Sequence, residues 1–125
     1  MTGRPVVFRR FPQVKPITGE FGCYLVQSSS RLRLWHRVDM LENRGNGWCG
    51  CEHFGMRIQP LLDRGEKPAL WLECRHLQAV RHYSAVELWT EIAKKLGVKD
   101  EERKRRNREA NKHAEHEELE ETEAA

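Results

Sequence analysis

The sequence predicts a small α+β domain in which a metal site fastens a β-hairpin to a helix. Three observations predict it. Strand-like alternation lies in the first half of the chain, helical patterns follow it, and cysteine and histidine recur in two close pairs. The chain has 125 residues, which is room for one domain. Because a hydrophobic core of this size is marginal, an additional cross-link would help to stabilise it.

Two segments of the first half have the pattern of strands. Residues 21–27 (FGCYLVQ) form the first. Residues 31–40 (RLRLWHRVDM) alternate with period two, which predicts a half-buried strand with one basic face. Its apolar face would carry Leu32, Leu34, His36, Val38 and Met40. Residues 42–47 (ENRGNG) end in Asn-Gly, the strongest short signal of a hairpin turn.

Helical patterns begin after Cys74, where one short helix is expected. A capping box from Ser84 to Glu87 would open a second helix. The apolar stripe of this second helix would consist of Leu88, Trp89, Ile92 and Leu96, and Gly97 would end it. Residues 54–73 contain Pro60, Gly65 and Pro68, so we expect irregular chain there with short extended pieces.

The end of the chain is dominated by charge. Residues 98–125 carry 7 basic and 10 acidic side chains, and Val98 and Leu119 are their only sizeable aliphatic residues. Such a segment builds no core of its own. Acidic residues precede basic ones by four positions, which favours a solvated single helix with frayed ends. The basic run at 103–108 leaves open a nucleic-acid arm or a localisation signal.

These patterns divide the chain into four parts. We expect an N-terminal arm and first strand (1–30), a zinc-binding module (31–83), a packing helix (84–97) and a charged helical or disordered tail (98–125). The arm itself would be extended over residues 5–11.

The compartment is predicted from what the sequence lacks. No apolar run approaches the ~20 residues that span a bilayer, and the first 16 residues lack the apolar stretch of a secretory signal. We therefore expect an intracellular protein without a membrane partner: cytoplasmic if its source is prokaryotic or a phage, nuclear if eukaryotic. Four cysteines in a reducing compartment favour metal or redox chemistry over disulfides.

Two tight pairs of donors form the candidate metal site. Cys49 and Cys51 are separated by 22 residues from Cys74 and His76. Residues i and i+2 project on the same side of an extended chain, but lie ~200° apart on a helix. Cys74 must therefore precede the helix, with His76 in its first turn. Four such donors match one closed, structural Zn²⁺ site, without an open position for catalysis.

Three alternatives to this site stay open. The cysteines could be ordinary core residues, because free cysteine is often buried. A catalytic Cys–His pair would leave two thiols unexplained. His53, two residues after Cys51, could replace His76 as a ligand. The remaining cysteine, Cys23, is expected to be a core thiol.

The pattern Cys-x-Cys, 22 residues, Cys-x-His resembles the SWIM zinc finger. The context agrees over roughly residues 31–83: an alternating strand, a hairpin, an apolar Trp48 before the first pair, and CRHLQAV at a helix start. The resemblance implies a ββα zinc module that binds DNA or proteins. Such modules occur beside chromatin-remodelling ATPases, in transposases and in recombination-associated proteins, and this chain is too short to include an ATPase or transposase domain as well.

The basic face of the alternating strand is the candidate nucleic-acid surface. It consists of Arg31, Arg33, Trp35 and Arg37, and Arg44 in the turn would extend it. Guanidinium groups ~6.6 Å apart roughly match phosphate spacing, and a tryptophan among them could stack on a base. The simpler alternative is a solvated strand whose tryptophan is covered by the N-terminal arm.

These observations predict recognition and not catalysis. The first interpretation is a nucleic-acid-associated accessory protein, with DNA as the expected ligand. The second is a protein–protein adaptor that docks on a larger complex through the helix around Leu88, Trp89 and Ile92. A thiol-based redox sensor is the third. The sequence contains no catalytic carboxylate pair, phosphate-binding glycine loop or nucleophile elbow, so we do not expect an enzyme.

Overall fold

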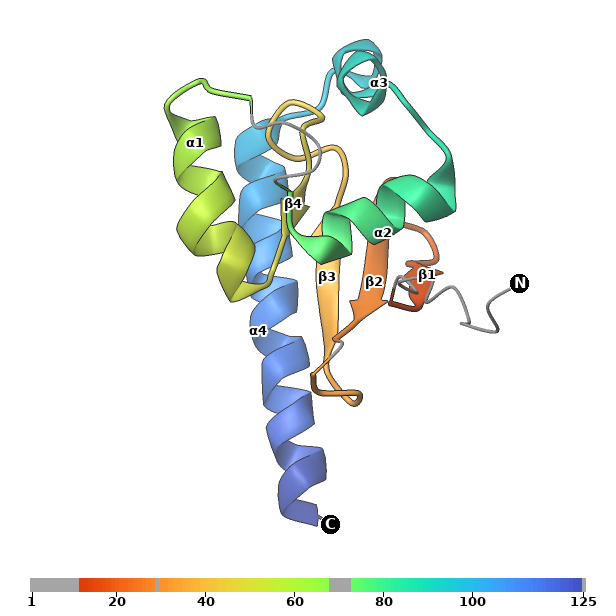
Figure 1. Cartoon of the computed structure of the whole chain (residues 1–125), viewed down its shortest axis with the longest axis vertical. Coiled ribbons are helices and arrows are strands. Elements are labelled where there is room, and N and C mark those ends of the chain that lie inside the picture. The colour runs from red at the N-terminus through yellow and green to blue at the C-terminus, as the bar shows by residue number, and fades with distance from the viewer. Residues whose placement is uncertain (1–11, 29, 68–72, 125) are drawn as a thin grey trace, which may run out of the picture.

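The fold is a four-stranded antiparallel sheet with helices on both faces (Figure 1). The computed structural model describes residues 12–28, 30–67 and 73–124, with side chains up to residue 112. The strands are β1 (Val14–Pro16), β2 (Cys23–Gln27), β3 (Trp35–Asp39) and β4 (Trp48–Cys49), paired in that order. The predicted α+β class is confirmed, and β1 is an additional edge strand that the sequence did not predict.

The helices follow the sheet in sequence. They are the π-helical turn η1 (Phe54–Ile58), α1 (Gln59–Asp63), α2 (Arg75–Ser84), α3 (Trp89–Leu96) and α4 (Asp100–Ala124). In Figure 1, α2 crosses one face of the sheet, and α4 runs along β3 and continues past the end of the sheet. Among the described residues, no helix is both long and apolar enough to cross a bilayer.

Strand β3 holds the two sides of the fold together. Its side chains alternate between the faces of the sheet. His36 contacts the ring of His76 on α2, with ring centroids 4.3 Å apart. Arg37 and Asp39 instead meet α4 through Asn107. The alternation predicted for this strand is therefore correct, but its polar face is covered by a helix.

The charged segment at the chain end is a docked helix over its first half. Arg103 donates to both carboxylate oxygens of Asp39 at 2.7 and 3.0 Å, and Arg108 donates to Glu42 at 2.8 Å. Asn107 is fully buried between these pairs. The prediction of a helix was correct and the prediction that it is solvated was wrong, because its charges match buried charges on the sheet and hairpin.

Three local predictions were also wrong. The alternating strand begins at Trp35, because residues 31–34 form a turn closed by a bond from the Leu34 amide to the Arg31 carbonyl at 2.9 Å. Residues 54–63 are helical, with Pro60 in the first turn of α1, where its missing N–H costs nothing. Ser84 ends α2 instead of capping α3. The extended segments expected at 5–11 and 69–72 lie outside the described residues.

The hairpin between β3 and β4 was predicted correctly, and Gly45 in its turn is in close contact with α3. The backbone at Gly45 has φ +86°, and a Cβ there would lie 2.4 Å from Cα of Thr90 and 2.5 Å from the carbonyl oxygen of Trp89. Both are backbone atoms, which cannot rotate away. The hairpin and α3 can therefore pack together only when this position has no side chain.

Replacing Gly45 tests this contact. We expect Gly45→Ala to lower the free energy of unfolding by about 2–3 kcal/mol, combining left-handed strain with displacement of α3. Gly19→Ala is the matched control, because Gly19 has a similar φ of +81° and nothing within 4 Å of its Cβ position. It should cost only the strain, about 1 kcal/mol. Urea denaturation of both variants measures the difference; equal losses would contradict a packing role for Gly45.

Candidate metal centre

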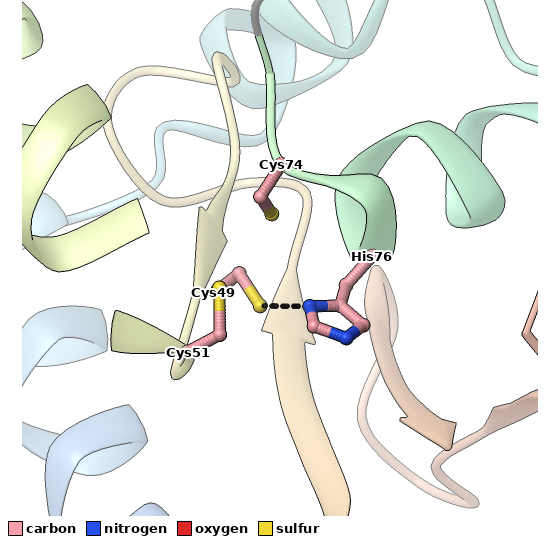
Figure 2. Close-up of side chains that lie close together, drawn as sticks. All are labelled: Cys49, Cys51, Cys74 and His76. Atoms are coloured by element: carbon pink, nitrogen blue, oxygen red, sulfur yellow. Dashed lines mark hydrogen bonds between the residues drawn. The ribbon is translucent and has the colours of Figure 1, made fainter. Parts of the chain in front are cut away.

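The two predicted pairs of donors meet at one point. The sulfur atoms of Cys49, Cys51 and Cys74 and a ring nitrogen of His76 all lie within 4.8 Å of one another. Figure 2 shows the two hairpin cysteines facing Cys74 from the chain before α2 and His76 from its first turn. The structure thus joins four side chains, and two segments 22 residues apart in sequence, into one cluster.

The local backbone explains this convergence. Cys49 ends β4, and the Gly50 amide donates to the carbonyl of Arg37 at 3.0 Å, which holds this end of the hairpin beside β3. Cys51 lies in the bend that follows, directly before the helical residues. Cys74 is the N-cap of α2, with the extended angles φ −65° and ψ 156°. His76 is the second residue of that helix. Cys74 before the helix and His76 in its first turn are as the spacing predicted, whereas Cys51 lies in a bend and not in the extended chain that was expected.

The distance between Cys49 and His76 suits a tetrahedral Zn²⁺ ion. With Zn–S of about 2.3 Å and Zn–N of about 2.0–2.1 Å, tetrahedral angles place sulfur and nitrogen about 3.6 Å apart. Sγ of Cys49 and Nδ1 of His76 are 3.6 Å apart. Three thiolates and a neutral imidazole are also a donor set typical of structural zinc. The residues present therefore fit the ion.

The pKa values of the three thiols are shifted by burial and by their contacts with one another. Contacts with the thiols of Cys49 and Cys74 lower the pKa of Cys51, whereas burial raises the pKa of Cys49. For Cys74, the contact with Cys49 lowers the pKa, but the Cys51 contact and burial outweigh it and raise the pKa to about 12. Burial of neighbouring thiols thus opposes their ionisation together, and a divalent cation would let all three sulfurs ionise.

Two helix starts lie against the cluster. The Phe54 amide, just after the hairpin, donates to Sγ of Cys51 at 3.4 Å. Cys74 itself occupies the N-cap of α2. Backbone amides and the positive end of the helix dipole both stabilise thiolate charge. With zinc bound, the centre would have a net charge of −1, which these groups offset.

The three cysteines of the cluster are almost fully buried. The relative exposures of Cys49, Cys51 and Cys74 are 1%, 8% and 3%. His36 packs on the fourth donor, and burial, followed by the charge of His76, lowers the pKa of His36. A neutral His36 is therefore favoured beside the site.

The alternative ligand and the remaining cysteine are placed clearly. His53 is exposed on the rim of an open pocket beside the cluster, and it is not among the four converging donors. Cys23 lies on the opposite face of the sheet, where Nη2 of Arg103 is 3.5 Å from its sulfur. Burial raises the pKa of Cys23 to about 11. Both observations agree with the predicted set and with Cys23 as a core thiol.

The predicted nucleic-acid face is not one continuous surface. Arg37 is buried and paired with Glu20 and Asn107, so its prediction as a surface contact was wrong. Arg31 and Arg33 are exposed in the loop before β3. Arg44 is exposed beyond the other end of the strand, roughly 13 Å or more away at about 3.3 Å per residue.

Trp35 lies at the same end of β3 as this loop. It is half-buried, and the ammonium group of Lys15 from β1 lies 4.2 Å from the centroid of its ring. One face of the ring is thus already occupied by a cation. A base could stack on that face only if Lys15 moved away.

Comparisons of the chain with protein-family models, with curated proteins and with solved structures found no match.

Proposed function

We propose that this chain is a SWIM-type zinc-binding module that acts in recognition, with nucleic acid as its first ligand class. The convergence of three buried cysteines and one histidine within 4.8 Å carries the proposal. Cys49, Cys51, Cys74 and His76 would hold one Zn²⁺ ion, which would cross-link the hairpin to α2. Because these residues supply a complete tetrahedral set, the role of the metal is structural.

Metal analysis tests the first part. Protein purified without added zinc should contain one equivalent of zinc per chain, released by a thiol-modifying reagent or by acid, since the ligands bind as thiolate and neutral imidazole. Mass spectrometry under native conditions and elemental analysis measure the stoichiometry. A metal-free protein with the same circular dichroism spectrum and cooperative thermal unfolding would refute a structural zinc.

The loop before β3 supports the nucleic-acid part. Arg31 and Arg33 are both exposed there. The first 48 residues carry 8 basic and 3 acidic side chains, a balance that favours contact with phosphate. Guanidinium groups in an exposed loop can contact successive phosphates without a precise fold around the ligand.

A salt titration tests this surface. We expect duplex or single-stranded DNA to bind with an affinity that falls steeply with salt, because each phosphate contact releases a counterion. Arg31→Ala/Arg33→Ala should lower the slope of log K against log salt by about 2, one for each lost contact. Arg57→Ala, an exposed arginine on η1, is the control and should leave the slope unchanged. Binding that is independent of salt would contradict the proposal.

A protein–protein adaptor is the second candidate, favoured by exposed apolar side chains. Met56 on η1 is 75% exposed, close to the metal centre in sequence. Trp89, predicted to belong to the docking helix surface, is instead buried with an exposure of 2%. If no nucleic acid binds, this candidate becomes the first. The redox-sensor role and the expectation that the protein is not an enzyme stay predictions.

A further inference from the structure

Helix α3 carries a second apolar stripe that the described part of the fold covers only in part, because Ile92 packs partly against the core and its neighbours in the stripe are exposed. Trp89 and Ala93 form its inner stripe and are buried against the core. Leu88, Ile92 and Leu96 follow each other at intervals of four, so they share a neighbouring face of the helix. Leu88 is 61% and Leu96 is 58% exposed, while Ile92 is half-buried.

Phe21 extends this stripe into a patch. It is 64% exposed, and its ring lies 5.9 Å from that of Trp89, beneath the stripe. Phe21 and Leu96 also line the same open cavity of about 650 Å³ between the β1–β2 loop and the start of α4. We call Phe21, Leu88, Ile92 and Leu96 the α3 patch. Large exposed side chains gathered in this way are typical of an association surface.

The charges beside the patch would complement those of a second α3 helix that runs in the opposite direction. Glu91, in the first turn of α3, and Lys95, in its last turn, lie one position before the stripe and are both exposed. Glu87 precedes the helix and Lys99 follows it, and they continue the order acid, acid, base, base. Among the residues that the structure describes, neither Glu91 nor Lys95 takes part in an ion pair.

We propose that the α3 patch is the interface of a two-fold symmetric homodimer, in which α3 of one copy packs antiparallel to α3 of a second copy. In a pairing centred on Ile92, Leu88 of each copy faces Leu96 of the other. Glu91 of each copy then lies within side-chain reach of Lys95 of the other. A two-fold interface needs a self-complementary surface, which this order of apolar and charged residues supplies.

The choice of a second copy over another protein rests on this charge order. A partner with uniform charge would meet attraction at one end of α3 and repulsion at the other. A reversed copy meets attraction at both ends, and opposite charges at the rim also fix the register. The same order suits the dipole of a single helix, so the decisive test must act between chains. The proposal does not depend on zinc or nucleic acid.

The first test is the mass of the full-length protein in solution. Sedimentation equilibrium from about 10 µM to about 1 mM, where small interfaces associate, should show the mass rise from 14.7 kDa towards twice that value. Glu91→Lys and Lys95→Glu should each weaken association at least about tenfold, because each places like charges opposite one another at two symmetric positions. Their circular dichroism spectra should match the wild type, because both side chains are exposed.

Mixing the two variants makes the test specific to the antiparallel arrangement. Glu91→Lys carries two lysines and Lys95→Glu carries two glutamates at these positions. An equimolar mixture should therefore form a heterodimer with an affinity close to that of the wild type, although neither variant associates well alone. A wild type that stays monomeric throughout, or variants that dimerise like the wild type, would overturn the proposal. The first of these outcomes would leave the α3 patch to a different protein.

Discussion

Cys74→Ser should abolish zinc binding and, with it, the folded state. Cys74 is the N-cap of α2 and one of the four converging donors, so its loss both opens the metal site and frees the helix from the hairpin. Structural zinc in finger peptides contributes an apparent ~10–16 kcal/mol, whereas a whole domain is stable by only ~5–15 kcal/mol. Losing the ion therefore removes more free energy than the whole stability of a typical domain.

The comparison with Cys23→Ser makes this result specific. Cys23 is as buried as the ligands, at 1% exposure, but lies on the other face of the sheet. Its serine variant should keep one zinc ion and lose no more than about 1–2 kcal/mol. Zinc content, near-ultraviolet circular dichroism and thermal unfolding distinguish the two variants. A Cys74→Ser protein that unfolds cooperatively without metal would show that the hydrophobic core alone suffices.

Asn107→Leu should be the most destabilising substitution outside the metal centre. Asn107 donates to Asp39 at 2.7 Å and to Glu42 at 2.9 Å, and it accepts from Nε of Arg37 at 2.8 Å. Leucine has a similar volume but none of these bonds. Two buried carboxylates and a buried guanidinium would each lose a partner, which we expect to cost about 3–5 kcal/mol.

Arg105→Ala is the control on the same helix, because Arg105 is exposed. It should change the free energy of unfolding by no more than about 0.5 kcal/mol. Chemical denaturation at saturating zinc measures both variants, so that a change in metal affinity does not enter the comparison. Similar stabilities for Asn107→Leu and the wild type would mean that α4 is held by other contacts.

The sequence was most informative where spacing along the chain constrains geometry. Cys49 and Cys51 must share a side of an extended chain, and Cys74 must precede a helix to share an ion with His76. These are local rules, and the structure confirms that the four donors converge and that Cys74 precedes the helix. The turn at residues 42–47 and the end of α3 at Gly97 were predictable for the same reason, since Gly47 and Gly97 both have left-handed backbone.

Predictions that depended on distant partners were wrong. Arg37 has the pattern of a solvent-facing residue, but its partner Asn107 is 70 residues away. The charges of residues 100–108 can pair within one helix, and Lys104 and Asp100 do so at 3.6 Å. Arg103 and Arg108 instead pair with carboxylates of the sheet and hairpin. From sequence alone, the charged face of the sheet and the charged helix α4 each have the pattern of a solvent-exposed surface. Only the structure shows that the two pack against each other.

Strand β3 cannot be moved to another protein with the candidate metal centre unless α4 goes with it. Its backbone at Arg37 accepts the amide of Gly50 between the two hairpin ligands, while its polar side chains are neutralised by α4. The side chain of Asn111 on α4 also fills the space beside Gly50. A Cβ at Gly50 would lie 2.3 Å from the side-chain amide oxygen of Asn111. A graft of residues 31–83 into a host protein would lack α4, so the carboxylates of Asp39 and Glu42 would lose their arginine partners. A metal centre of this kind can therefore be transferred to another protein only together with α4, which lies far from it in sequence.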